Sequence, residues 1–247
     1  MHKFFVDTNQ ISENNICILG KDVKHIKDVL RLRLNDKIEI SVEGINYICE
    51  IQEILKDKII TSILSKTLGE NEPPIDIILY QGLTKGNKMD LIIQKGTEIG
   101  VKEFYIISTN RSIVKIKDKK KEKSRVERLE LIAEEASKQS KRDYIPEVKG
   151  ILSFKDMINL LRYEKNIIVP YEDEKNIGLK EALKDISGGR IHLIIGPEGG
   201  FELYEIEKLK EIGAKIVSLG PRILRTETAG FVAATAILYE LGDLGVI

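Results

Sequence analysis

Short apolar runs with alternating polar positions fill the first 70 residues of the chain. They lie at Lys3–Val6, Ile16–Leu19, Lys37–Val42, Tyr47–Ile54 and Ile59–Leu64, and turn residues separate them. One stretch, Val23 to Leu30, instead has apolar residues at helical spacing. This pattern predicts a small β-barrel that one short helix interrupts.

The pattern changes after the segment from Gly69 to Pro74, which contains two prolines. From there, buried-type strands alternate with amphipathic helices, which predicts a parallel α/β sheet with helices on both faces. We therefore divide the chain into residues 1–70 and 71–247. The predicted strands are Ile75–Gln81, Phe104–Ser108, Asn166–Val169, Ile191–Ile195 and Lys215–Leu219, and the predicted helices are Asn87–Ile99, Lys119–Ser140, Phe154–Leu161, Leu179–Ile186, Glu202–Ile212 and Glu227–Leu241.

Three loops after predicted strands have an unusual composition. We call them the first loop (170–173), the second loop (196–201) and the third loop (219–229). In parallel α/β sheets, ligands bind at the carboxyl ends of the strands, where such loops lie. The second loop, Gly-Pro-Glu-Gly-Gly-Phe, lacks the spacing of a dinucleotide or nucleoside triphosphate site. Its glycines would let the backbone approach a flat ligand, although a plain strand-to-helix turn explains them as well.

The third loop places two arginines, a glutamate and two threonines between a buried strand and the last apolar helix. A purely structural interpretation makes Thr226 a helix N-cap, sets Glu227 at the positive end of the helix dipole and pairs the arginines with nearby carboxylates. This interpretation explains the threonine and the glutamate. It gives Arg222 and Arg225 no specific role, so they remain candidates for ligand contact.

Charge is balanced overall but not along the chain. There are 39 Lys and Arg residues against 39 Asp and Glu residues. Residues 1–72 carry 10 basic and 12 acidic side chains, residues 73–145 carry 16 and 11, and residues 146–247 carry 13 and 16. The zero total argues against a nucleic-acid partner, which needs a basic surface, but the middle third is basic enough to provide one.

The sequence does not indicate a membrane-spanning, secreted or metal-binding protein. No apolar run reaches the length of a membrane span, and the first residues lack the pattern of a signal peptide. Cys17 and Cys49 lie in strand-like stretches, which favours buried thiols in a reducing cytosol. The three histidines have no metal-ligand spacing with either cysteine, so no metal is expected.

Two strings resemble a known family. Residues 193–201 read Leu-Ile-Ile-Gly-Pro-Glu-Gly-Gly-Phe, and residues 219–229 read Leu-Gly-Pro-Arg-Ile-Leu-Arg-Thr-Glu-Thr-Ala. Together they resemble the signature of the bacterial 16S ribosomal RNA uridine-N3 methyltransferases, which belong to the SPOUT class of trefoil-knotted enzymes. Further matches follow in order at 25–31, 85–90, 95–100, 110–112 and 135–142. Asn35 departs from the family, which more often has glycine there.

The resemblance implies a SPOUT α/β-knot, with a parallel sheet, helices on both faces and a C-terminal trefoil knot, plus an N-terminal PUA-like β-barrel that binds RNA. It also implies a homodimer that uses S-adenosylmethionine. Residues of the three loops would bind this cofactor: Pro170, Gly196, Pro197, Glu198, Gly199, Leu219, Gly220, Ile223, Leu224 and Arg225.

The implied reaction suggests two catalytic candidates. Uracil N3 carries a proton, so a base or a cation that stabilises the uracil anion should assist methyl transfer. We expect Arg225 to give electrostatic help and keep Glu198 as a candidate base. A structural role for Glu198 and Glu227 is the alternative.

The implied substrate is 16S ribosomal RNA in the 30S subunit, in the cytoplasm. The expected RNA surface combines side chains of the barrel with side chains of the basic middle third. Two of these assignments have an ordinary alternative: the Lys117–Lys123 run could equally be a solvated helix start, and His25 could be an ordinary helical residue. Two other functions stay open: another SPOUT methyltransferase acting on a ribose 2′-oxygen or a different base, and a non-catalytic RNA-binding ribosome-assembly factor. The RNA-contact candidates are His25, Arg31 and Arg33 in the barrel, and Lys85, Lys88, Arg111, Arg142 and the lysine run in the middle third.

Overall fold

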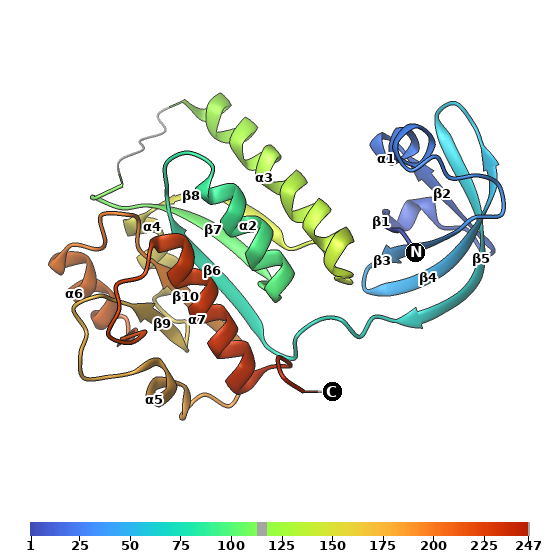
Figure 1. The fold of residues 1–247 in the computed structure, drawn as a ribbon. Coiled ribbons are helices and arrows are strands. Elements are labelled where there is room, and N and C mark those ends of the chain that lie inside the picture. Colours follow the sequence, from blue (N-terminus) through green and yellow to red (C-terminus); the bar gives the residue numbers. More distant parts are fainter. Residues whose placement is uncertain (113–117, 247) are drawn as a thin grey trace. The chain divides into compact units, whose positions relative to one another are not determined.

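The computed structural model describes residues 1–112 and 118–246 (Figure 1). The chain forms two compact units, and each is described by itself. Unit 1 contains Met1–Glu72 and Ser137–Ile145, and unit 2 contains Pro73–Ala136 and Pro146–Ile247. Within the described residues, no helix has both the length and the apolar composition needed to cross a bilayer.

Unit 1 is built on a five-stranded mixed sheet in the order β1-β3-β4-β5-β2. All five predicted strands are present, and only the β1–β3 pair is parallel. Alternating residues such as Ile16, Ile18, Ile38 and Ile40 point into one core, as the two-residue period of a strand requires. The strands are β1 (Lys3–Phe5), β2 (Asn15–Leu19), β3 (Lys37–Val42), β4 (Ile45–Ile54) and β5 (Lys58–Leu68).

The predicted helix between Val23 and Leu30 is not regular. A short α-helical turn, α1 (Lys21–Lys24), continues as a π-helical turn over His25–Val29, and Val23 and Ile26 are buried in the core of unit 1. The chain then turns at Asn35, whose φ of 69° lies in the left-handed region. Asparagine tolerates this conformation better than most residues, which explains why it can stand where the family more often has glycine.

The segment Ser137–Ile145 belongs to unit 1 although it is far from Glu72 in the sequence. The side chain of Lys3 is fully buried and donates hydrogen bonds to Asp143 Oδ1 at 3.0 Å and to Asn46 Oδ1 at 2.9 Å. Ser41 Oγ donates to the Asp143 carbonyl at 2.8 Å. These buried polar contacts hold the segment against the sheet, so unit 1 contains more than the predicted range 1–70.

Unit 2 is an entirely parallel six-stranded sheet in the order β11-β9-β10-β6-β7-β8. Its elements are β6 (Asp76–Gly82), α2 (Lys88–Ile99), β7 (Glu103–Ser108), α3 (Lys119–Ser140, whose last turn is counted with unit 1), β8 (Glu147–Ser153), α4 (Phe154–Leu161), β9 (Ile167–Pro170), α5 (Leu179–Leu183), β10 (Arg190–Ile195), α6 (Leu203–Glu211), β11 (Lys215–Val217) and α7 (Thr226–Leu241).

Helices cover both faces of this sheet, as the sequence predicts (Figure 1). On one face α7 packs against α2, α5, β6 and β10. On the other face, residues of α4 and α6 such as Met157 and Leu209 share a core with Ile78 and Tyr80 of β6. Successive β6 residues alternate between the faces, so Gln81 points towards α7.

Strand β8 has no counterpart in the sequence prediction. It lies at the edge of the sheet, and its burial follows no regular alternation. Gly150 also interrupts the strand, which lowers its strand propensity. An edge strand of this kind lacks the apolar run that identifies the central strands.

Candidate functional site

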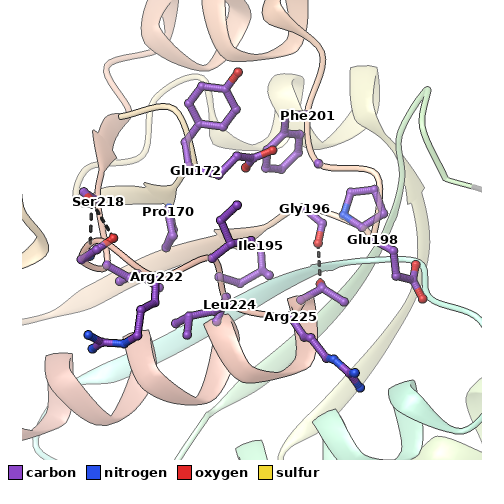
Figure 2. Close-up of a pocket in the computed structure, with 18 of the residues that line it drawn as sticks. Pro170, Glu172, Ile195, Gly196, Glu198, Phe201, Ser218, Arg222, Leu224 and Arg225 are labelled. Atoms are coloured by element: carbon purple, nitrogen blue, oxygen red, sulfur yellow. Dashed lines mark hydrogen bonds between the residues drawn. The ribbon is translucent and has the colours of Figure 1, made fainter. Parts of the chain in front are cut away.

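A cavity of about 510 Å³ lies at the carboxyl edge of the unit 2 sheet (Figure 2). The first, second and third loops form most of it, because β9, β10 and β11 are parallel and end at the same edge. Its volume is within the usual range for small-molecule sites. The lining residues are Lys88, Pro170, Tyr171, Glu172, Ile195, Gly196, Pro197, Glu198, Gly200, Phe201, Ser218, Leu219, Gly220, Pro221, Arg222, Ile223, Leu224, Arg225, Thr226 and Ala229.

The interior of the cavity is apolar and its rim is charged. Figure 2 shows Pro170, Ile195 and Leu224 lining the space between the loops. The guanidinium groups of Arg222 and Arg225 extend away from that space in different directions. Such a cavity suits a flat, largely apolar ring with polar substituents at its edges.

Backbone hydrogen bonds join the first loop region to the start of the third loop. Tyr171 N donates to Val217 O at 2.9 Å, and Ser218 N donates to Ile177 O at 2.8 Å. The third loop then turns at Gly220, whose φ of 108° favours glycine and whose N–H donates to Ser218 Oγ at 3.2 Å. The third loop therefore starts from a fixed position beside β9.

The prediction that Thr226 is the N-cap of the last helix is wrong. Arg225 has the extended backbone of the N-cap residue, and Thr226 is the first residue of α7. The Thr226 hydroxyl donates to the carbonyl of Gly196 at 2.5 Å, a bond drawn in Figure 2. It thus connects the third loop to the second loop.

Lys88 lies between two carboxylates at one side of the cavity. Its Nζ is 3.2 Å from Glu198 Oε1 and 3.5 Å from Glu227 Oε2. Glu198 Oε1 also accepts a hydrogen bond from Lys85 N at 3.2 Å. Burial raises the pKa of Glu198, but the backbone N–H bonds and the Lys88 ammonium outweigh burial and hold this pKa below its usual range.

The two arginines of the third loop have no carboxylate partner among the residues that the structure describes. Both side chains are exposed, and neither forms an ion pair or hydrogen bond within the described part of the chain. The structural interpretation, in which nearby carboxylates pair with them, therefore does not hold. They are free to contact an anionic or polar ligand at the rim.

The structure brings the expected cofactor residues together, with one exception. Pro170, the second-loop residues and the third-loop residues of that set all line the cavity, whereas Gly199 does not. Gly199 instead lies under Arg111, whose Nη1 donates to its carbonyl at 3.1 Å.

Sequence reasoning missed other lining residues. Most belong to or directly adjoin the three loops, so the unusual composition of those segments was a usable signal for Tyr171, Glu172, Phe201 and Ser218. Lys88 reaches the cavity from α2; the sequence analysis assigns it to RNA contact, and no local pattern places it at the cofactor cavity.

In unit 2, three of the RNA-contact candidates contact the second loop. Lys85 and Lys88 contact Glu198, and Arg111 contacts Gly199. The side chains of Lys119 to Lys123 in the first turns of α3 include exposed lysines, whereas Lys117 lies outside the described residues. The second loop is thus bordered by cations on two sides.

In unit 1, Arg31 and Arg33 are exposed and His25 is partly buried, with its ring edge-on to Phe4. Arg142 does not fit the expected RNA surface. It is 3% exposed, and its Nε donates to Glu72 Oε1 at 2.9 Å while Nη2 donates to Glu72 Oε2 at 2.6 Å. This two-point pairing uses the guanidinium inside unit 1, so we assign Arg142 a structural role.

Across residues 1–112 and 118–246, no group of three or more His, Cys, Asp or Glu side chains is arranged to hold a metal ion.

Comparison with known proteins finds a matching family model for each of the two parts of the chain. The family model of the RNA methyltransferase domain matches residues 71–238, and that of the RNA methyltransferase PUA domain matches residues 18–64. The chain is 37% identical to the ribosomal RNA small subunit methyltransferase E of Bacillus subtilis, with 97% of both chains covered. It is 35% identical to the protein of the same name from Aquifex aeolicus, covering 93% of this chain and 95% of that one.

Among solved structures, the Neisseria gonorrhoeae ribosomal RNA small subunit methyltransferase E bound to S-adenosylmethionine has a TM-score of 0.88 and 29% identity, with 99% of both chains covered. Together with the matched PUA domain, this similarity confirms the fold class predicted from the sequence.

Proposed function

This chain belongs to the RNA methyltransferase family, and on that premise we propose that it methylates N3 of a specific uridine in 16S ribosomal RNA of the 30S subunit, with S-adenosylmethionine as the methyl donor. The observation that carries the proposal is the cavity formed by the three loops, with two exposed arginines at its rim. We place the reaction in the cytoplasm, where small subunits are assembled.

The residues of the cavity fit S-adenosylmethionine. Ile195, Leu219 and Leu224 offer apolar surfaces to an adenine ring, and the backbone of Gly196 and Gly220, which also lines the cavity, offers hydrogen-bonding groups to its edge. When bound, this cofactor supplies a methyl group on a positively charged sulfonium. The remaining task of the protein is to align the uracil and to stabilise the charge that its ring acquires.

A cation beside the cavity can supply that stabilisation. Methylation at uracil N3 would require the N3 proton to leave, and with no base assigned among the described residues it would pass to solvent water. The two carbonyl oxygens of the ring would then carry negative charge until the methyl group is bound. The Arg225 guanidinium lies on the rim and has no ion-pair partner among the described residues, so we assign it to these oxygens. Lys88 is already paired with Glu198 and Glu227, so it adds no uncompensated positive charge, and the assignment rests on Arg225.

Glu198 is a poor candidate for the base, because its lowered pKa keeps it ionised and makes it a weak proton acceptor. We expect Glu198→Gln to retain methylation within about tenfold of wild type, whereas loss of a general base costs about 10²–10⁴-fold. The amide oxygen of glutamine can still accept from Lys85 N, so the loop keeps its position. Initial rates at saturating cofactor measure this effect.

Glu198→Ala is the matched comparison for this prediction. It removes the acceptor for Lys85 N and the partner of Lys88, so we expect a larger loss than in the glutamine variant. A loss of 100-fold or more in Glu198→Gln, at unchanged cofactor affinity, would identify the carboxylate as the base.

We assign RNA contact to two sets of exposed cations. In unit 2 these are Lys85, Arg111 and the exposed lysines at the start of α3, and in unit 1 they are Arg31 and Arg33. Positive side chains bind the phosphate backbone without reading its sequence, so the choice of uridine depends on other contacts.

Nucleoside mass spectrometry tests the proposed reaction directly. The purified protein is incubated with isotopically labelled S-adenosylmethionine and with either unmodified 30S particles or naked 16S RNA, and the RNA is digested to nucleosides. We expect labelled N3-methyluridine from the particles. Label on a ribose or another base would identify a different RNA methyltransferase, and cofactor binding without RNA labelling would favour a non-catalytic assembly factor.

We also propose that the active form is a homodimer joined through α7 and the third loop. Ile223 is 88% exposed and Tyr239 is 70% exposed, and Val232 lies on α7 between them in sequence. Large exposed apolar side chains on one helix and the adjoining loop favour a protein interface. A second copy seated there would also cover the cavity rim.

Charged substitutions on α7 test the dimer. We expect the double variant Val232→Glu/Tyr239→Glu to elute as a monomer and to lose methylation, because buried unpaired charges oppose association. Light scattering coupled to gel filtration gives the mass. Tyr163→Glu is the control, since Tyr163 is 89% exposed but lies after α4. A monomeric wild-type protein with full activity would exclude the dimer.

A further inference from the structure

Two consecutive hydrogen bonds connect β6 to both the second and the third loop. The Gln81 side chain is 1% exposed, and its Nε2 donates to Thr226 Oγ1 at 2.8 Å. The Thr226 hydroxyl in turn donates to the Gly196 carbonyl at 2.5 Å (Figure 2). Gln81 does not line the cavity, whereas Thr226 and Gly196 do.

The hydrogen-bonding capacity of these groups fixes the direction of both bonds. A carbonyl oxygen only accepts, so the single proton of the Thr226 hydroxyl goes to Gly196. The hydroxyl oxygen can then only accept from Gln81, and only the NH₂ end of the amide can donate to it. A glutamine meets this requirement, while an ionised glutamate of the same size does not.

The same orientation leaves the other end of the amide without a partner. Gln81 Oε1 is buried, and within the described residues nothing hydrogen-bonds to it. A buried carbonyl without a partner is unfavourable for folding, and an apolar side chain of similar size would avoid this cost. The amide therefore contributes through its NH₂ end, with a bond to Thr226 Oγ1 at 2.8 Å and a longer one to the carbonyl of Gly82 at 3.3 Å.

Packing brings the second loop directly onto the end of β6. A Cβ added to Gly82 would lie 2.3 Å from Pro197 N and 2.7 Å from the carbonyl carbon of Gly196. The backbone at Gly82 therefore packs directly against the second loop. Gln81, the preceding residue, reaches the start of α7 with its side chain. Together they set the distance between the two loops that enclose the cavity.

We propose that Gln81 is a positioning residue for the cofactor site, acting through Thr226 to fix the Gly196 carbonyl and the start of α7. The proposal rests on the proposed function for the identity of the cofactor. When Gln81 cannot donate, the Thr226 hydroxyl loses its bond to β6, so the Gly196 carbonyl and the start of α7 are held less firmly in place.

Cofactor affinity tests this role. In Gln81→Met, which keeps the size and removes both hydrogen-bonding groups, we expect the Kd for S-adenosylmethionine by calorimetry to rise about tenfold. Thr226→Val should give a similar rise, and Thr226→Ser, which keeps the hydroxyl, should restore affinity to within about threefold of wild type. The double variant Gln81→Met/Thr226→Val should bind no more weakly than Thr226→Val alone, because loss of the Thr226 hydroxyl already removes both bonds of the chain.

A stability control separates positioning from folding. Leu79→Met changes a buried neighbour on the same face of β6 without touching Thr226, so it should lower the Tm without changing the Kd. A wild-type Kd in Gln81→Met, whatever the Tm of the variant, would overturn the proposal. If the wild-type protein itself did not bind S-adenosylmethionine, the proposed function would fail, which is a different result from equal binding by wild type and variants.

Discussion

Arg225→Ala is expected to lower the rate of methyl transfer by about 10²–10³-fold, the usual effect of removing one donor that stabilises a developing oxyanion. Arg225 is exposed at the cavity rim and has no ion-pair partner in the described residues, so its removal should leave the fold intact. Single-turnover rates with pre-bound cofactor measure the chemical step, and circular dichroism verifies folding.

Two companion variants make this result specific. Arg225→Lys keeps the charge but loses the planar, two-point geometry, so its rate should lie between those of wild type and the alanine variant. Arg162→Ala removes an exposed arginine at the end of α4 and should have little effect. Unchanged turnover in Arg225→Ala would remove this residue from the mechanism.

Asp143→Ala is expected to lower the free energy of unfolding by about 3 kcal/mol, since removing one partner of a buried ion pair leaves the other charge uncompensated. The carboxylate accepts hydrogen bonds from Lys3 Nζ at 3.0 Å, Asn46 Nδ2 at 2.6 Å and Asn71 N at 2.8 Å. Lys3 keeps Glu39 Oε1 at 3.1 Å, which limits the loss. Urea denaturation at neutral pH measures the difference.

The pH dependence of this contribution has a definite sign. Burial raises the pKa of Asp143, but the hydrogen bonds from Asn46, Asn71 N and Lys3 outweigh burial and hold this pKa below its usual 3.8. The stabilisation is therefore complete above the unfolded-state pKa and is lost as the pH falls through the lower folded-state value. The difference in free energy of unfolding between wild type and Asp143→Ala should therefore become smaller in acid.

An exposed aspartate of the same unit provides the control. Asp57→Ala should change the free energy of unfolding by less than about 0.5 kcal/mol, as is usual for surface substitutions. An equally small change in Asp143→Ala would mean that segment Ser137–Ile145 is not held by its carboxylate.

Local patterns in the sequence predicted most elements of the fold. The helix over Lys119–Ser140 has the predicted bounds because its apolar stripe is long and regular. The three loops are recognisable from their composition. Segments that follow a buried strand and contain proline, several glycines or two arginines are uncommon among plain turns. The edge strand β8 was missed because it produces no regular period, whereas the helix predicted from Val23 to Leu30 is present but includes a π-helical turn at His25–Val29.

Contacts between distant residues account for the remaining errors. Arg142 was predicted to bind RNA because it is a cation in a basic segment, yet it pairs with Glu72 across 70 residues of sequence. Thr226 was interpreted as an N-cap because it precedes a helix, yet its hydroxyl bonds to Gly196 and receives a bond from Gln81, 145 residues away. A polar residue at the end of the buried run Ile75–Gln81 was the only local sign of that contact.

The strand order β11-β9-β10-β6-β7-β8 also has a consequence for the timing of folding. Of the strands of this sheet, β6, β7 and β8 are synthesised first. Strand β6 stays without its second neighbour until β10, which pairs with it along Asp76–Gln81, has been made. Until then one apolar edge of a parallel sheet is open, and such edges recruit other chains. Parallel pairing over long sequence separations is also slow. The interval between translation of β8 and of β10 is therefore when we expect a nascent chain to depend most on chaperones.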